Sequence, residues 1–334
     1  MKKNLFTGAL ALTLSAAFLA GCGSSGSSST ASTTAAQAST TASATTAASA
    51  ETTAAASEAA GETTAAAEDS SSDYDFTKDP IDLKLGVVGS IYEDMWKPAV
   101  DTLKDEGINL ELVQFSDYVT PNNALANGEI DLNAFQHRIY LKSDSESNGY
   151  EITNIGNTFL TPLNLYSAKI TSFDNIKDGD TIAVPNDPTN EGRALKVLAA
   201  SGLIKLKDDA NFNPTLDDIE SYSKQVKIEE LAANTIPSTL PDVTAGIING
   251  NYALDFGLKA DDAIYKDSVL DEPEYWNLIA ARTKDLSDPK LVAAYDKVVK
   301  AYQSQGTQDV FDNEFGGFFI ASGWDEDLLA DYKK

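Results

Sequence analysis

Two patterns of hydrophobic and polar positions alternate along residues 74–334. Short apolar runs typical of buried strands are followed by stretches in which apolar residues recur every three or four positions, as in amphipathic helices. This rhythm predicts an α/β fold in which crossover helices join parallel strands. The expected strands are Ile81–Val88, Leu110–Phe115, Ile130–Leu132, Ile152–Phe159, Leu163–Ser167, Thr181–Val184, Val226–Glu229 and Gly246–Ile248. The expected helices lie around Trp96–Glu106, Asn122–Asn127, Pro289–Gln303 and Thr307–Phe311.

A further helix is expected from Pro188, directly after the strand Thr181–Val184. Pro188 lacks an N–H and has a helical φ, so it suits the first helical position, with Asp187 as the N-cap. Arg193 and Val197 lie off the apolar face of this helix, so Arg193 is expected to point toward the end of the strand. The expected apolar face consists of Leu195, Leu198, Ala199, Gly202 and Leu203.

Arg193 is the first candidate for a ligand contact. The N-terminus of a helix presents unpaired N–H groups and the positive end of the helix dipole, and a nearby guanidinium adds two donors that match a carboxylate. The expected ligand is therefore a small anion or a free carboxylate. The alternative is that Arg193 pairs with a surface acid such as Glu191.

Aromatic and amide side chains follow several of the expected strands, where sites of open α/β sheets lie. Tyr118, Phe135, His137 and Tyr140 could wall a slot for an apolar or thioether side chain, because a sulfur atom over a ring is favourable by roughly 0.3–1.5 kcal/mol. Asn249 can accept from an ammonium group and donate to a carboxylate. The alternatives are that Phe135 packs in a core with Ile139, four residues on, and that Asn249-Gly250 is a turn.

The sequence gives little support for catalysis or for a metal. His137 is the only histidine and Cys22 the only cysteine, so a zinc site would lack partners. No serine has a G-x-S-x-G setting, and Gly86-Val87-Val88-Gly89 lacks the spacing of a dinucleotide or phosphate loop. We therefore expect no catalytic residues, no cofactor and no enzyme activity.

The N-terminal region predicts export and lipid attachment. Residues 1–21 combine two lysines with an apolar run too short to span a membrane, as in a secretory signal peptide. Leu19-Ala20-Gly21-Cys22 resembles a bacterial lipobox, in which the cysteine becomes the lipid-bearing N-terminus. Residues 22–73 are almost wholly Ser, Thr, Ala and Gly, which predicts a disordered tether. We expect a protein anchored by the lipid on Cys22 to the extracytoplasmic face of the cell membrane.

The charge of the chain argues against anionic partners. Its formal net charge is -26, which opposes binding to nucleic acid and to anionic lipid headgroups. The expected link to the membrane is therefore the lipid and not a basic patch.

Several motifs, in order, resemble the NlpA lipoprotein family of methionine-binding proteins, from about Leu83 to Trp324. They include Tyr118-Val119, Asn133-Ala134-Phe135-Gln136-His137 with Tyr140, Val184-Pro185-Asn186-Asp187-Pro188-Thr189-Asn190 with Gly192-Arg193, and Ile248-Asn249. The resemblance implies a type II periplasmic-binding-protein fold, in which two α/β lobes joined by crossover strands close on an amino acid. It implies lobes at about 81–165 with 250–334 and at 166–249, within a substrate-binding domain of 74–334.

The same resemblance implies roles for single residues and for partners. Positions matching Tyr118, Phe135 and His137 line the side-chain pocket, Arg193 holds the ligand carboxylate, and Asn249 contacts the amino-acid backbone. The matching loop also contains Asn186 and Asn190. The implied function is capture of L-methionine and delivery to the permease and ATPase of an ABC importer. The D-isomer, a methionine-containing dipeptide or another apolar amino acid is an alternative ligand. A surface enzyme or an adhesin on a stalk is the rival class.

Overall fold

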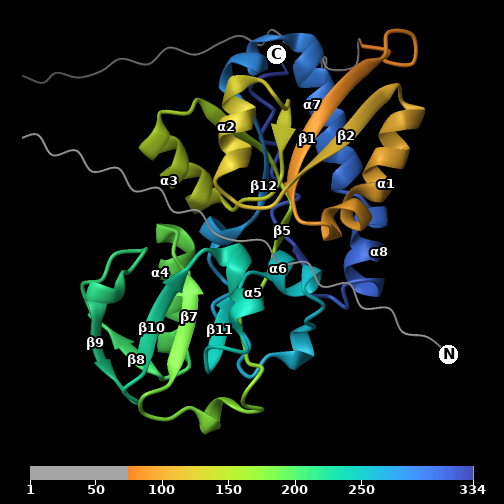
Figure 1. Cartoon of the computed structure of the whole chain (residues 1–334). Helices are drawn as coiled ribbons and strands as arrows, with labels where there is room; N and C mark the ends of the chain where they lie inside the picture. Colours follow the sequence, from red (N-terminus) through yellow and green to blue (C-terminus); the bar gives the residue numbers. More distant parts are fainter. Residues whose placement is uncertain (1–73, 334) are drawn as a thin grey trace, which may run out of the picture. The chain divides into compact units, whose positions relative to one another are not determined.

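The computed structural model describes residues 74–333, whose elements are labelled in Figure 1. The described residues all belong to one compact unit of the chain. The predicted signal peptide, the lipidation site Cys22 and the tether 22–73 lie outside the described residues and stay predictions. In the described part of the chain, no helix has both the length and the apolar character needed to cross a bilayer.

The first sheet has five strands. In spatial order they are β2 (Ile108–Phe115), β1 (Ile81–Val88), β3 (Leu132–Asn133), β12 (Leu278–Arg282) and β4 (Ile152–Asn157). β1 is parallel to both β2 and β3, whereas β12 runs antiparallel between β3 and β4. We call the part of the molecule built on this sheet the first lobe.

Helices pack against this sheet on both faces (Figure 1). One set is α1 (Ile91–Asp105), α7 (Pro289–Tyr302) and α8 (Gln305–Asn313), and the other is α2 (Thr120–Asn127) and α3 (Arg138–Asn148). β12 shows the result most clearly: Ile279 and Ala281 belong to the larger core with α1 and α7, whereas Leu278 and Ala280 belong to a smaller core with α2. β12 is buried on both faces, so every residue of it is buried.

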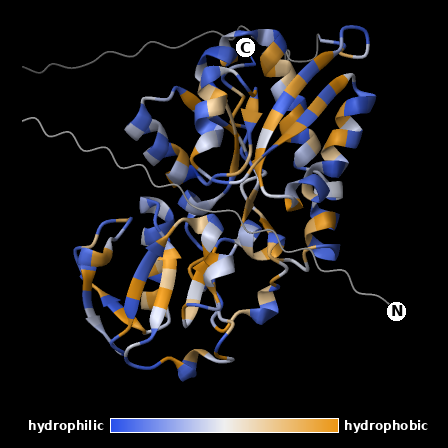
Figure 2. Ribbon diagram, viewed as in Figure 1, coloured by the Kyte–Doolittle hydropathy of each residue, from blue (hydrophilic) through white to orange (hydrophobic). Residues whose placement is uncertain are grey.

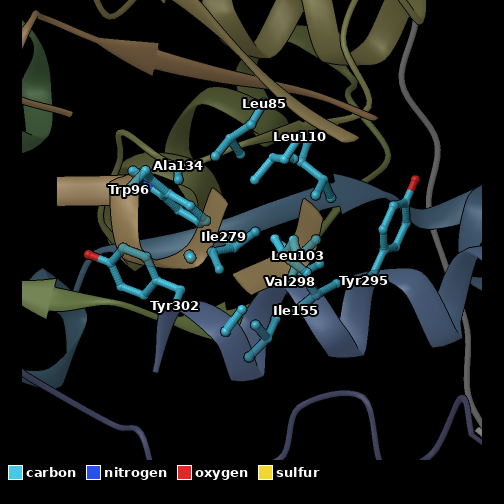
Figure 3. Close-up of a cluster of buried hydrophobic side chains, with 14 of the residues drawn as sticks. Leu85, Trp96, Leu103, Leu110, Ala134, Ile155, Ile279, Tyr295, Val298 and Tyr302 are labelled. Atoms are coloured by element: carbon cyan, nitrogen blue, oxygen red, sulfur yellow. The ribbon is translucent and has the colours of Figure 1, made fainter. Parts of the chain in front are cut away.

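The larger core is centred on α1 and α7. Trp96 and Tyr302 bring their ring centroids to 4.3 Å, and Figure 3 shows both near Ile279 of the sheet. Figure 2 shows orange and blue residues alternating along α1 and α7, as expected for helices that bury one face. Burial of this apolar surface is the main force that fixes the first lobe.

The second sheet has four strands and defines the second lobe. In spatial order they are β10 (Lys227–Leu231), β7 (Thr181–Pro185), β11 (Ala245–Ile248) and β6 (Asn164–Tyr166). β6 is antiparallel to β11, and the other pairs are parallel. The remaining elements here are α4 (Pro188–Ala200), α5 (Ile236–Thr239), α6 (Gly250–Asp255), β8 (Ile204–Leu206) and β9 (Ile219–Tyr222).

The chain crosses between the two sheets twice. It leaves β4 through β5 (Phe159–Leu160) to reach β6, and it returns after α6 to reach β12. β5 pairs with β13 (Ile320–Ala321), near the C-terminus. Along the return segment, Tyr265 bridges to Leu165 of β6, so it lies with the second sheet although the expected division assigned it to the first lobe. The lobe boundaries themselves stay a prediction.

Parallel strands joined by helices are present as expected, and both sheets also contain an unpredicted antiparallel strand, β6 in one and β12 in the other. β12 was not predicted as a strand, because its short apolar run fits a buried strand or part of a buried helix equally well. The helix predicted at Pro188 is present as α4, with Asp187 as its N-cap. Val197, expected off its apolar face, is fully buried because α4 contacts both β7 and β8.

Candidate functional site

One pocket gathers nearly all of the predicted ligand-binding residues. Its cavity volume is about 30 Å³, room for one or two water molecules, so the lining side chains lie close together. The first lobe and the second lobe both contribute to its wall. The predicted residues in this wall are Tyr118, Phe135, His137, Tyr140, Asn190, Arg193 and Asn249.

Asn186 is the predicted residue that the structure does not bring into this pocket. Its backbone N–H donates to the carbonyl of Leu231 at 2.9 Å and so ties the end of β7 to β10. Asn186 instead lines a neighbouring hollow with Asp187 and Asn234. Its place in the matching loop therefore predicted a position near the pocket, but Asn186 is not part of the pocket wall.

Aromatic rings form the apolar side of the pocket. The ring centroids of Tyr118 and Phe135, which follow β2 and β3, are 5.9 Å apart, and Tyr252 lies 4.9 Å from Tyr118. Tyr140 stands edge-on to Tyr118 at 6.2 Å and to Phe135 at 5.9 Å. Offset and edge-on contacts of this kind stabilise aromatic clusters. The wall is therefore a formed surface for an apolar or thioether side chain.

Hydrogen bonds hold the tyrosines of this wall in place. The Tyr118 hydroxyl donates to Asn251 Oδ1 at 2.5 Å, and Asn251 Nδ2 donates to the Val88 carbonyl at 3.0 Å. The Tyr140 hydroxyl donates to the Tyr118 carbonyl at 2.9 Å. Burial raises the pKa of both tyrosines well above its usual value, so both hydroxyls keep their protons and donate.

Buried amides hold the loop that carries Phe135. Asn133 Nδ2 donates to Asn122 Oδ1 at 2.9 Å, Asn122 Nδ2 to Gln136 Oε1 at 2.8 Å, and Gln136 Nε2 to Asn133 Oδ1 at 3.0 Å. Phe135 lies before α3 and lines the pocket, whereas Ile139 lies within α3 and is half-buried. The alternative that the two share one helical core face is therefore wrong.

His137 has a defined tautomer because it caps α3. Its Nδ1 accepts from the Tyr140 backbone N–H at 3.1 Å, so the proton of the neutral ring lies on Nε2, which is 3.4 Å from Asn190 Oδ1. Burial and the nearby positive charge of Arg193 lower the pKa of His137 to about 3. The imidazole is therefore neutral at any pH near 7 and supplies a donor, not a charge.

Arg193 is buried in the wall and does not pair with Glu191. Its Nη2 donates to the Thr161 carbonyl at 2.8 Å and to Asp267 Oδ2 at 2.9 Å, and its guanidinium lies over the ring of Tyr275, 4.6 Å from the centroid. Glu191 instead accepts from the backbone N–H of Leu216. The alternative of a surface pair with Glu191 is therefore wrong: the partner is an internal carboxylate.

The orientation of Asn249 follows from a chain of hydrogen bonds. Both Asp187 oxygens accept from Asn190 Nδ2, at 3.0 and 2.9 Å, which leaves Asn190 Oδ1 as an acceptor. Asn249 Nδ2 donates to that oxygen at 2.9 Å. The Asn249 amide is thereby fixed with its nitrogen occupied and its oxygen available, and this role goes beyond that of a turn residue.

Three buried polar atoms of residues in the pocket wall have no partner among the described residues. They are Arg193 Nε, Asn249 Oδ1 and Thr161 Oγ1. A buried polar atom without a partner costs roughly 1–3 kcal/mol, so a ligand that pairs with such atoms gains affinity. A donor on a guanidinium and an amide acceptor in one pocket match the carboxylate and the ammonium of an amino acid.

Other residues of the wall were not among the predicted candidates. Gln136 lies within a motif that the sequence had singled out, and Asn251 lies two residues after Asn249, so proximity to predicted residues was the available signal. Thr161 follows β5 on the crossover segment, and no local pattern marks it. The unpredicted wall residues are Tyr92, Gln136, Phe159, Thr161, Asn251, Asn277 and Phe319.

The part of the chain that the structure describes contains no candidate metal site. There, no group of three or more His, Cys, Asp or Glu side chains could hold a metal ion. The pocket wall instead presents neutral amides, aromatic rings and one guanidinium.

Comparisons with known proteins agree with this geometry. The family model described as NlpA lipoprotein matches residues 83–323. The D-methionine-binding lipoprotein MetQ of Escherichia coli (strain K12) is 41% identical over 251 residues, which cover 74% of this chain and 90% of that protein. The chain belongs to the NlpA lipoprotein family.

Two solved structures share the fold. A nutrient binding protein from Burkholderia cenocepacia bound to methionine is 41% identical, with a TM-score of 0.67, covering 72% of this chain and 100% of that one. A periplasmic substrate-binding protein of an ABC transporter from Coxiella burnetii is 39% identical, with a TM-score of 0.67 and the same coverage of 72% and 100%. The periplasmic-binding-protein fold expected from the sequence is confirmed.

Proposed function

We propose that this protein is a solute-binding lipoprotein that captures methionine and delivers it to an ABC importer. The observation that carries the proposal is the pairing, in one pocket, of the unpartnered Arg193 Nε and Asn249 Oδ1 with an aromatic wall. The methionine named in two of the relatives and the ABC transporter named in a third support it.

In the proposed complex, polar groups bind the amino-acid end of the ligand and aromatic rings bind its side chain. Arg193 donates to the carboxylate and Asn249 Oδ1 accepts from the ammonium, and hydrogen bonds to charged groups are roughly twice as strong as neutral ones. The thioether lies against Tyr118, Phe135 and Tyr140. Since these groups come from both lobes, a bound ligand holds the lobes together and the closed form gains stability.

The role is binding and not catalysis. His137, the one imidazole of the wall, uses Nδ1 to cap α3, and its pKa of about 3 makes it a poor general base at neutral pH. A pocket without a catalytic group leaves its ligand chemically unchanged. Such a pocket suits a protein that carries its ligand and then releases it.

Delivery requires a partner and an anchor. We propose that the lipid on Cys22 holds the protein on the extracytoplasmic face of the membrane, and that the receiving partner is a permease with its ATPase. The lipoprotein name of the family supports the anchor. The formal charge of -26 supports a lipid anchor over a basic patch, because an acidic surface is repelled by anionic headgroups.

Isothermal titration calorimetry of the purified chain tests the proposal. L-methionine, D-methionine, a methionine-containing dipeptide and leucine are titrated separately, with alanine as the control that keeps the carboxylate and the ammonium but lacks the side chain. We expect one methionine per chain and much weaker binding of alanine. Stronger binding of the dipeptide or of leucine would change the ligand, and no binding of any of them would overturn the proposal.

A further inference from the structure

Asp267 carries a carboxylate that lies behind the pocket wall, with 0% of its side chain exposed. Its Oδ2 accepts from Arg193 Nη2 at 2.9 Å and from the Leu163 N–H at 3.0 Å, and its Oδ1 accepts from the Val269 N–H at 2.8 Å. Its own N–H donates to Asn164 Oδ1 at 2.8 Å. The carboxylate is thus fixed on the crossover segments and cannot turn toward a ligand.

The Arg193–Asp267 pair sets the electrostatic balance of the pocket. Among the described residues that line it, Arg193 is the one with a full charge, because His137 is neutral. Asp187, the other carboxylate close by, is half-exposed and caps α4, where the helix dipole offsets its charge. The positive charge of Arg193 and the negative charge of Asp267 therefore cancel within the wall.

We propose that Asp267 is a specificity-determining residue, which makes the pocket select a neutral zwitterion over a ligand of the same shape that carries only a carboxylate. The inference rests on the proposed function, since it takes Arg193 as the contact of the ligand carboxylate. An anion that enters this pocket meets the guanidinium and, just behind it, a carboxylate of like charge. A zwitterion enters without net charge, and its ammonium meets Asn249 Oδ1. Burial of a net charge is costly, whereas a balanced pair is tolerated.

Asp267 also positions the guanidinium. With Nη2 held by Asp267 and by the Thr161 carbonyl, and with the plane lying over Tyr275, the group has one orientation, and Nε is left without a protein partner. Loss of positioning alone would weaken all carboxylate ligands together. Loss of charge balance would change the affinities for the zwitterion and for the anion by different factors. The ratio of the two affinities therefore separates the two roles.

The test compares methionine with 4-(methylthio)butanoate, which lacks only the ammonium group, by calorimetry on the purified chain. The quantity measured is the ratio of the two dissociation constants, anion over methionine. In Asp267→Asn the guanidinium is no longer compensated, so the ratio should fall by about tenfold or more relative to the wild type. Glu106→Gln, which removes a carboxylate from a remote ion pair with Lys297, should leave the ratio unchanged. An unchanged ratio in Asp267→Asn would overturn the inference.

A second variant decides the question if Asp267→Asn does not fold. Arg193→Gln combined with Asp267→Asn removes both buried charges, a change that proteins often tolerate. Its affinities are expected to be weak and can be followed at millimolar ligand by NMR. If the wild-type pair is balanced, the ratio in this variant stays within about threefold of the wild-type ratio. A rise above about tenfold would show that Arg193 acts in the wild type as an uncompensated charge, which overturns the inference.

Failure of the inference is distinguishable from failure of the proposed function. If the wild type binds another amino acid and not methionine, the proposed ligand is wrong, and the same ratio is then measured with that amino acid and its des-amino analogue. If the wild type binds the anion as tightly as the zwitterion, methionine capture can stand while the role of Asp267 falls. If no amino acid binds, both fall.

Discussion

Arg193 could be found from the sequence because its signal is local: a strand, a capped helix start and an arginine in the second turn of that helix. Its partner could not, because Asp267 is 74 residues further along the chain and lies in a segment with no motif. The charge state of His137 was equally hidden, since it depends on burial and on Arg193. Local chemistry predicts which residues can bind, whereas tertiary contacts decide how they are charged and oriented.

The structure changes which substitution best tests Arg193. Arg193→Ala would leave the buried Asp267 carboxylate unpaired, which costs about 3–5 kcal/mol of stability and mixes folding with binding. Arg193→Lys keeps the charge beside Asp267 but lacks the planar fork, so one nitrogen cannot serve both carboxylates. We expect methionine affinity to fall by about 10- to 100-fold by calorimetry, with little change in the melting temperature without ligand.

The matched control is Arg282→Lys. Arg282 is also buried and pairs with Asp285 and Asp131, but it is not part of the pocket wall. The Arg282→Lys variant should bind methionine as the wild type does. Equal affinity in Arg193→Lys and the wild type would mean that Arg193 does not hold the carboxylate.

His137 makes a pH-dependent contribution to stability. Its pKa is about 3 in the folded chain, against about 6.5 when unfolded, so the unfolded state binds a proton first as the pH falls. The contribution is fully present above pH 6.5 and is lost on acidification. Between pH 7 and pH 5 the wild type should lose about 2 kcal/mol more of its unfolding free energy than His137→Asn.

Urea unfolding of both proteins at the two pH values measures this difference, and asparagine is used because it can also cap α3. Carboxylates that titrate in both proteins cancel in the comparison. Identical losses would show that His137 is not buried in its neutral form.

At the scale of elements, caps were more predictable than strands. Asp187 followed by Pro188 predicts the start of α4, because Asp is a preferred N-cap and Pro a preferred first helical residue. The structure has that cap. β12 carries no such signal: its apolar run fits a strand or a buried helix, and only its place between β3 and β4 decides. The order of strands within a sheet is set by packing across the whole lobe, and the sequence pattern does not contain it.

Asp187 links the start of α4 to the pocket and allows the two roles to be separated. Asp187→Ser keeps an oxygen that accepts from the Asn190 backbone N–H, so stability should change by less than about 0.5 kcal/mol. Serine cannot also hold Asn190 Nδ2, so Asn190 no longer orients Asn249. Methionine affinity should therefore fall by about tenfold, as measured by calorimetry beside a thermal melt.

Asp288 provides the control, because it caps α7 and is not part of the pocket wall. Asp288→Ser should change neither affinity nor stability appreciably. If Asp187→Ser binds methionine like the wild type, the hydrogen bonds through Asn190 do not set the pocket.

At the scale of the whole molecule, the resemblance predicted what patterns could not, namely two lobes with a pocket walled by both. The pattern of hydrophobic and polar positions predicted α/β elements, but Tyr118 and Arg193, on different lobes, are joined into one site only by the crossover segments. Thr161 lies on one of these segments and was missed for that reason. The tether 22–73 stays a prediction of composition.

Anchoring is tested on the full chain. Since Cys22 is the only cysteine and the predicted site of lipid attachment, Cys22→Ala should move the protein from the membrane to the soluble fraction, as judged by fractionation at high salt. Cys22→Ala purified from that fraction should still bind methionine, because the pocket lies wholly within residues 74–333. Retention of the variant on membranes would contradict lipid attachment at this residue.

The cancelled charges of Arg193 and Asp267 affect how ligand capture depends on the ionic strength of the medium. With a formal net charge of -26, the surface attracts cations and repels anions over a range that salt shortens. A ligand without net charge, entering a wall without net charge, is neither steered nor repelled and displaces few counterions. Capture should therefore proceed at nearly the same rate in dilute and in saline surroundings, which suits the extracytoplasmic location that we propose.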